Sequence, residues 1–453
     1  MRAGSFGGIV TIALAVSVVP CGAQALEQPL RSAPPRDPDR TTSQLTLTAS
    51  ALGGYDDHLT AGGGLTLQSP DIDESGYSGF GEVALRYRRG KKARSFFLEG
   101  SSYLLSYSSL SIDSPVGGQI LAGGDATFGR SNRIEVVQHV RTDPYVAFGA
   151  FGPLGQDLGP GAGPDANPVN GLTPNRSWGS LSSASVDWHW TPRTTFSTGY
   201  EYRRNEYIGD VGFDNRAHMA RLALDRSLTR TTALTALYRY TDTLLVEPAR
   251  NENLPVTEQT SEIGFDYEKP LSRTRRIGFS AGAGATHIET VSRVGGRPLK
   301  DWTPSGHASI RADIGRTWAI SADYRRGVTF LDGITPEFFL ADVVLLRTEG
   351  TLGRSLELTF STGYSNGAQT AGLVTGRYET FTLAAQARRT IARAWAVLVS
   401  YNRSDYRLFG FPAPPLGPTP RFDRNAIRVG MTYFFAQSST RTPRPARPGR
   451  TGS

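Results

Sequence analysis

Apolar and polar residues alternate one by one along most of this chain, in segments of about ten residues. In segment 356–364, for example, Leu358 and Phe360 alternate with Glu357 and Thr359. A strand places successive side chains on opposite faces of a sheet, so each segment predicts a strand with one apolar and one polar face.

A short turn pattern separates many of these segments: an apolar residue, a small residue, Arg, and then Ser, Thr or Ala. Its copies are Phe128-Gly129-Arg130-Ser131, Leu228-Thr229-Arg230-Thr231, Leu271-Ser272-Arg273-Thr274, Ile314-Gly315-Arg316-Thr317, Leu352-Gly353-Arg354-Ser355 and Ile391-Ala392-Arg393-Ala394. From residue 190 onward the copies recur after about 40 residues, which leaves room for two strands and one longer loop. Short turns that alternate with long loops predict an outer-membrane β-barrel.

The polar face of the strands carries charges in one segment after another, whereas the other face is apolar. A soluble sandwich would not place charges on its buried inner face, so the pattern favours lipid outside and water inside. We therefore predict an all-β fold, a transmembrane antiparallel up-and-down barrel, whose inner charges hydrate and brace the wall more readily than they form a solute track. The residues predicted to line the pore are Arg203, Arg221, Arg239, Glu262, Asp266, Arg311, Asp313, Asp323, Arg325 and Glu357.

The turns and the two terminal segments together predict about 18 strands, with 16 as the alternative because the first and third strands are weakly patterned. The last segment has apolar residues at every second position and ends in an aromatic residue. These positions are Ile427, Val429, Met431, Tyr433 and Phe435. They resemble the C-terminal insertion signal of outer-membrane proteins, which implies recognition by the barrel-assembly machinery. The barrel is predicted to span residues 43–435.

The first 25 residues predict a cleaved secretory signal peptide. Arg2 precedes an apolar run over 9–19, and Ala23 and Ala25 form a cleavage site of the small-x-small type. Cleavage after Ala25 removes Cys21, the only cysteine, so the mature chain would have no disulfide or thiolate chemistry.

Two further terminal segments are rich in Pro and Arg and are predicted to be disordered in the periplasm: the linker 26–42 and the tail 436–453. The formal net charge of +8 comes mostly from Arg. In a barrel of the bacterial outer membrane, this charge indicates turns and rims that face lipid and lipopolysaccharide phosphates, rather than nucleic acid.

The longest predicted loop covers residues 145–176 and is rich in Gly and Pro. General porins fold the loop at this position into the pore, and the sequence leaves open whether this loop enters the lumen. The six histidines are scattered, without metal-ligand spacing or a nucleophile motif. We therefore predict no enzyme activity, no metal and no cofactor.

A short motif follows the first strand, Gly54-Tyr55-Asp56-Asp57-His58. It resembles the Gly-Tyr-Asp-Asp-Asn opening of a family of outer-membrane β-barrel porins associated with exopolysaccharide export loci, with His58 in place of the Asn. The resemblance implies a passive channel for hydrophilic solutes, with surface polysaccharide and its export components as the expected solute and partners. The alternative is a closed structural or adhesion barrel, and the few aromatics expected on the inner face, Phe97 and Tyr103, leave the solute open.

Overall fold

The computed structural model describes residues 41–57, 75–91, 93–108, 116–129, 132–143, 146–148, 171–173, 176–208, 214–247, 252–272, 274–291, 298–315, 317–331, 335–369, 376–410 and 421–441. The predicted signal peptide, most of the predicted linker and tail, His58 and most of loop 145–176 lie outside these residues. The described part of the chain contains no helix long and apolar enough to cross a membrane.

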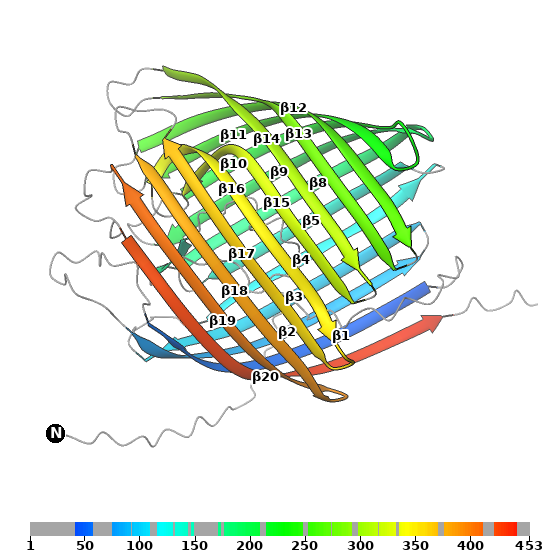
Figure 1. The fold of residues 1–453 in the computed structure, drawn as a ribbon, viewed down its shortest axis with the longest axis vertical. Coiled ribbons are helices and arrows are strands. Elements are labelled where there is room, and N and C mark those ends of the chain that lie inside the picture. The colour runs from blue at the N-terminus through cyan, green and yellow to red at the C-terminus, as the bar shows by residue number, and fades with distance from the viewer. Residues whose placement is uncertain are drawn as a thin grey trace, which may run out of the picture.

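Eighteen strands form one closed antiparallel barrel, as predicted (Figure 1). The strands in the first half of the chain are β1 (Thr41–Asp56), β2 (Gly76–Lys91), β3 (Arg94–Tyr107), β4 (Val116–Phe128), β5 (Asn132–Asp143), β8 (Arg176–Thr191), β9 (Thr194–Ile208), β10 (Asp214–Ser227) and β11 (Thr232–Glu247). Those in the second half are β12 (Glu252–Ser272), β13 (Arg275–Val291), β14 (Pro298–Ile314), β15 (Trp318–Leu331), β16 (Thr335–Leu352), β17 (Leu356–Gln369), β18 (Arg377–Ala392), β19 (Trp395–Phe409) and β20 (Arg421–Arg441). Two short strands, β6 (Val146–Phe148) and β7 (Gly171–Thr173), pair with each other in a separate sheet.

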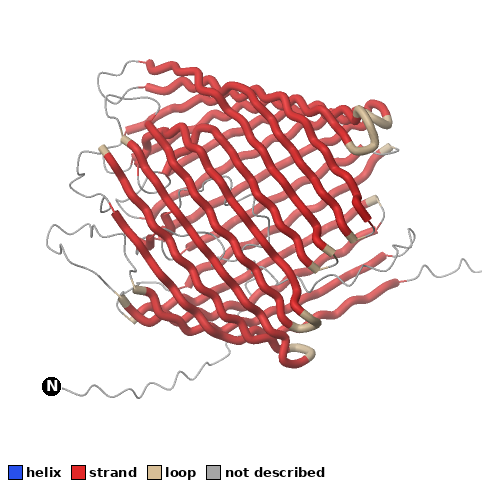
Figure 2. Tube along the Cα trace, viewed as in Figure 1, coloured by secondary structure: helices blue, strands red, loops and turns tan. Residues whose placement is uncertain are grey.

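The barrel strands are 12 to 21 residues long, longer than the alternation alone predicted. A tilted strand crosses the apolar part of a bilayer in about ten residues, so the additional residues extend the wall beyond it. Figure 2 shows the described residues almost entirely as strands, with short turns between some of them.

Short connections gather at one end of the barrel, which we call the turn end, and the long ones at the opposite, loop end. The repeated turn pattern provides many of the short connections, and its small residue has a structural reason in three copies. Gly129, Gly315 and Gly353 have φ angles of 63°, 71° and 68°, a left-handed conformation that glycine adopts without steric cost. Bacterial barrels keep short turns in the periplasm, so the loop end faces the cell exterior.

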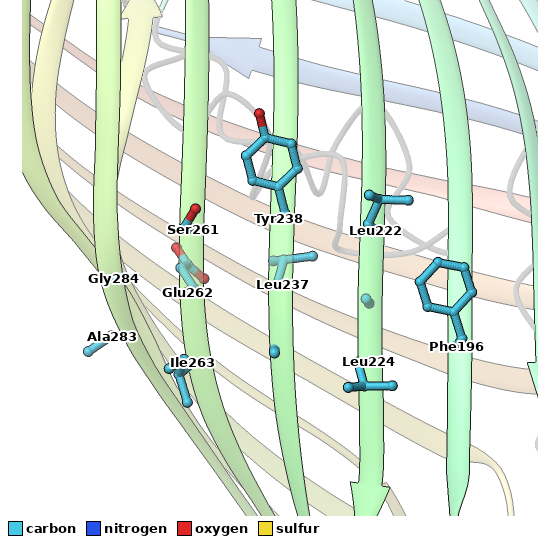
Figure 3. Close-up of a pocket in the computed structure, with 12 residues that line it drawn as sticks. Phe196, Leu222, Leu224, Leu237, Tyr238, Ser261, Glu262, Ile263, Ala283 and Gly284 are labelled. Atoms are coloured by element: carbon cyan, nitrogen blue, oxygen red, sulfur yellow. The ribbon is translucent and has the colours of Figure 1, made fainter. Parts of the chain in front are cut away.

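The outer face of the wall is apolar. Leu222 pairs with Tyr238, Ala236 pairs with Ile263, and the register places these side chains on the same face of the sheet. Figure 3 shows Leu222, Tyr238 and Ile263 around a shallow depression in that outer face. Aromatic rings mark both borders of the apolar face, as expected at membrane interfaces. Those toward the turn end include Trp188, Phe196, Trp318, Trp395 and Tyr433, and those toward the loop end include Tyr55, Tyr77, Tyr200, Tyr202 and Tyr240. A closed barrel with this surface belongs in the outer membrane.

The Gly-Tyr-Asp-Asp motif closes the barrel, because it lies where β1 pairs with β20. Asp56 is fully buried and accepts hydrogen bonds from Arg424, whose Nη2 lies 2.8 Å from Asp56 Oδ1. The Asn425 amide donates to Asp57 Oδ2 at 2.6 Å. A Cβ at Gly54 would lie 2.6 Å from the carbonyl oxygen of Ile427, so only glycine fits there.

Strand β20 continues past Phe435 to Arg441, and β1 begins at Thr41. Residues 436–441 pair with residues 41–46, so the barrel includes more residues at both ends than the predicted range of 43–435. The extension is favourable because each of these segments would otherwise leave a row of backbone groups unpaired. The insertion-signal residues Ile427, Val429, Met431 and Phe435 are exposed on the outer face.

Candidate functional site

Charged side chains occupy the inner face of β9–β15, which we call the charged sector. Inner and outer residues alternate in register across these strands, so Glu262 projects from the opposite side of the sheet to its neighbour Ile263 (Figure 3). Nine of the ten residues predicted to line the pore lie on this inner face. They are Arg203, Arg221, Arg239, Glu262, Asp266, Arg311, Asp313, Asp323 and Arg325. The tenth, Glu357, is on the inner face of β17.

Some of these predicted residues meet in ion pairs. Arg203 lies 2.9 Å from Glu201, and Arg311 lies 3.6 Å from Asp313. The side chain of Arg311 is 70% exposed, so water screens its interaction and the pair contributes little to stability, about 0–1 kcal/mol.

A histidine reaches across one strand to a carboxylate. His307 Nδ1 on β14 lies 3.3 Å from Glu262 Oε2 on β12, and β13 runs between them. Gly282 makes the contact possible, because a Cβ there would lie 2.5 Å from the His307 ring. Arg325 stands directly opposite His307 on β15. Position-by-position alternation predicted the inner face, but it did not predict this contact, which depends on a glycine in the strand between.

Hydroxyl groups fill the inner face between the charges. Thr235 Oγ1 lies 2.8 Å from a carboxylate oxygen of Asp225 and 2.8 Å from one of Asp266, and can donate its one proton to either. Thr260 and Thr286 hydrogen-bond each other at 2.9 Å, and Thr260 also donates to Glu258 at 3.1 Å. Glu258 is not among the residues predicted to line the pore. It lies on the same face of β12 as Glu262, so the alternation of side chains could have predicted it.

Two arginines of the charged sector face each other without a carboxylate between them. Arg221 on β10 pairs in register with Arg239 on β11, and both project inward. Among the described residues, neither guanidinium has an acidic oxygen within ion-pair distance, although the carboxylates of Glu258 and Glu262 interact with Arg239 from further away. Like charges directly opposite each other weaken a strand pair, so this position favours a hydrated inner surface where counter-ions are available.

The inner face of β16–β20 and β1–β3, which we call the packed sector, has a different character. Its large side chains are buried, and they include Tyr107, Tyr378, Tyr406 and Phe434. The expectation that Phe97 and Tyr103 are the few aromatics of the inner face is therefore wrong. Alternation alone does not distinguish a strand face that meets water from one that meets other side chains.

Several charges of the packed sector are matched by a partner of opposite charge. Arg388, 4% exposed, donates to Glu357 at 2.8 Å and lies 4.2 Å from the centre of the Phe434 ring. Glu99 accepts a hydrogen bond from Arg88 at 3.1 Å and forms an ion pair with Arg86, whose Nε lies 2.9 Å away. Burial makes an unpaired charge costly, so these pairs hold the packed sector together rather than offer binding groups.

The described residues contain no group of three or more His, Cys, Asp or Glu side chains arranged to hold a metal ion. What the charged sector provides is a hydrated surface with charges of both signs. Such a surface can conduct water, ions and polar solutes.

No protein-family model matches the chain, and no curated protein matches it. Among solved structures, it is similar to OccK11 (OpdR) of Pseudomonas aeruginosa, with 12% identity, a TM-score of 0.44, and 87% of this chain and 96% of that chain covered. It is similar to OccK2 (OpdF) of Pseudomonas aeruginosa in complex with glucuronate, with 12% identity, a TM-score of 0.45, and coverage of 87% and 98%. It is also similar to OccAB3 of Acinetobacter baumannii, with 13% identity, a TM-score of 0.44, and coverage of 87% and 99%. At these values the likeness concerns the fold alone.

Proposed function

We propose that the protein is a passive channel for hydrophilic solutes in the bacterial outer membrane. The observation that carries the proposal is the charged sector: inward-facing ionic groups such as Arg221, Asp266 and Arg311 are exposed inside a wall whose outer face is apolar. Exposed charges inside a membrane protein require water around them, and water along the wall gives a polar solute a path.

Surface polysaccharide is the solute class we propose. Two features support it, the Gly-Tyr-Asp-Asp motif and the mixture of hydroxyl and ionic groups on the inner face. Ser280 and Ser309, for example, hydrogen-bond each other at 2.8 Å among the charges. Hydroxyl groups both donate and accept hydrogen bonds, which suits the hydroxyls of a sugar chain. In this proposal the barrel-assembly machinery inserts the protein, and polysaccharide export components deliver the glycan from the periplasm.

Single-channel conductance of the refolded protein in a planar bilayer tests the channel. We expect stable current steps, and we expect added hydrophilic oligosaccharides to reduce the current through an open channel. A folded barrel without conductance would contradict the proposal. Conductance that oligosaccharides leave unchanged would retain the channel and reject polysaccharide as its solute.

A second function, a closed structural or adhesion barrel, is supported by the packed sector. Phe339 and Tyr378 are fully buried although both belong to the inner face, and their rings meet edge to face at 5.1 Å. Side chains that fill the inner face narrow a lumen. A lack of conductance from protein shown to be folded would favour this second function.

A further inference from the structure

Every short connection at the turn end carries a positive charge. Eight hairpin connections lie at this end, and each contains one basic residue and no acidic residue. In chain order these basic residues are Lys92, Arg130, Arg193, Arg230, Arg273, Arg316, Arg354 and Arg393. Arg193, Arg230, Arg354 and Arg393 lie among the residues that the structure describes, and we call these four the turn arginines.

Turn geometry does not explain this pattern of charge. Aspartate, asparagine and glycine are the usual residues of tight turns, because Asp and Asn side chains hydrogen-bond the turn backbone and glycine adopts a positive φ. The turns do use glycine, as at Gly315 and Gly353, but aspartate is absent from all eight connections. The positive charge of this end therefore has a cause other than the conformation of the turns.

The turn arginines stand on opposite sides of the barrel mouth that faces the periplasm. Arg193 and Arg230 follow β8 and β10, whereas Arg354 and Arg393 follow β16 and β18, on the other side of the closed sheet (Figure 1). All four residues are exposed. Among the described residues, no carboxylate lies within ion-pair distance of any of them. Their charges therefore add to one positive field around the mouth.

Most carboxylates on the inner face near this mouth have an arginine as partner. Glu268 lies 2.9 Å from Arg276, and Glu349 lies 3.1 Å from Arg347. The described carboxylates of this region without an arginine at ion-pair distance are Asp187, Asp225, Asp266 and Asp323. Positive charge therefore predominates in the outermost layer of the mouth, which is the layer that a solute from the periplasm meets first.

The connections at the loop end carry mostly negative charge. Their acidic residues are Asp57, Asp71, Asp73, Glu74, Asp113, Asp157, Asp165, Asp210 and Asp332. Their basic residues, apart from His58, are Arg250, Arg293 and Arg297. The two ends of the barrel therefore differ in the sign of the charge that the sequence assigns to their connections, and an anionic solute distinguishes them.

We propose that the turn arginines attract an acidic polysaccharide to the periplasmic mouth of the channel. The inference rests on the proposed function and names the class of polysaccharide within it. Rings of Arg or Lys favour anions at the mouths of pores, and guanidinium groups bind carboxylates through charge-assisted hydrogen bonds. A chain of acidic sugars meets several turn arginines at once, so weak single contacts combine. Fixed charges cannot drive net transport, but they raise the rate at which the chain enters.

Block of the single-channel current by oligogalacturonate, an oligosaccharide of carboxylated sugars, tests the proposal in the full-length protein. In about 0.1 M salt, oligogalacturonate on the turn side should halve the current at a concentration about tenfold lower than on the loop side. Neutral dextran of matched length should block equally from both sides. Salt at about 1 M screens the turn arginines and should remove the difference between the sides. Equal block by oligogalacturonate from both sides at low salt would overturn the proposal.

Charge reversal locates the effect. The variant R193E/R230E/R354E/R393E should raise the half-blocking concentration on the turn side by about tenfold or more. The matched control is R176E/R216E/R377E/R421E, which makes the same change at exposed arginines of the loop end and should keep the turn-side block unchanged. An unchanged turn-side block in the first variant, or an equal loss in the control, would overturn the proposal.

The same recordings test the channel separately from its solute class. Stable current that acidic and neutral oligosaccharides block alike, from either side, would retain the proposed channel and reject only the acidic polysaccharide. A folded barrel without current would reject both.

Discussion

The charged sector and the packed sector are built by the same alternation of side chains, yet inward-facing charges are exposed in the first and buried in the second. In the charged sector Arg311 is 70% exposed, whereas in the packed sector Arg388 is 4% exposed and has both a carboxylate and an aromatic ring as partners. An inward-facing charge in a barrel is therefore not by itself a pore residue. Its environment decides whether it interacts with passing solutes or holds the wall together.

The largest effect we expect comes from the buried ion pair at the β1–β20 seam. The substitution Asp56→Asn leaves Arg424 buried beside a neutral amide, and the free energy of unfolding should fall by about 3 kcal/mol or more. Denaturant unfolding in detergent, followed by tryptophan fluorescence, measures this change. The matched substitution Asp266→Asn, at an exposed position of the charged sector, should cost less than about 1 kcal/mol. Equal losses in the free energy of unfolding at Asp56 and Asp266 would contradict the difference between buried and exposed charges that separates the two sectors.

A slightly smaller effect is expected from an aromatic side chain on the inner face. Phe339 is fully buried, so Phe339→Ala should lower the free energy of unfolding by about 3 kcal/mol through lost contacts and a cavity. Phe360 lies on the outer face and is 39% exposed. Phe360→Ala should cost about half as much or less, because lipid fills the space that the ring leaves. The same unfolding measurement compares the two, and a larger loss at Phe360 would contradict the packing of the inner face.

Two glycines, one on each face of the wall, differ in the space around them. A Cβ at Gly367 would lie 2.2 Å from the Tyr378 ring, whereas a Cβ at Gly81 on the outer face meets nothing within 4 Å. Gly367→Ala should therefore destabilise the barrel by about 2 kcal/mol. Gly81→Ala should change stability by less than about 1 kcal/mol, and in the stabilising direction, because alanine is the better strand residue. Thermal unfolding of both variants measures these changes. A neutral Gly367→Ala would contradict the close packing of Tyr378 against Gly367.

The smallest effect on stability should accompany the clearest effect on conduction. R221E/R239E reverses an exposed and a half-buried charge of the inner face, so the free energy of unfolding should change by less than about 1 kcal/mol. The reversal potential in a salt gradient should shift toward cation selectivity, because anions lose two attractive groups. R226E/R389E makes the same charge change on the outer face and serves as the control. A shift of equal size in that control would place the determinants of selectivity outside the inner face.

Much of this architecture could be predicted from the sequence because strand period and facing are local properties. The faces of residues such as Leu358 and Glu357 can be predicted from the residues next to them in the sequence, and the glycines of the turn pattern predict the turns. The number of strands follows from counting these local signals. The end of the barrel at residue 435 could not be predicted correctly in this way, since pairing with β1 extends β20 to Arg441.

The packed sector could not be predicted in the same way, because its contacts join residues that are distant in the sequence. Tyr378 is an inward residue like any other until Phe339, on a strand two places away, packs against it. The contact of His307 with Glu262 likewise needs the absence of a side chain at Gly282.

The bond between Asp56 and Arg424 joins residues separated by 368 positions, and so spans most of the polypeptide. Contacts of such long range form slowly, since the chain must lose a large amount of conformational entropy before they are made. The last strand to leave the ribosome is the partner that the first strand requires. Until the two meet, both present open edges that can recruit strands from other molecules. A buried salt bridge at this junction stabilises the closed barrel over the open sheet. A barrel that has closed should therefore reopen rarely on the time scale of cell growth.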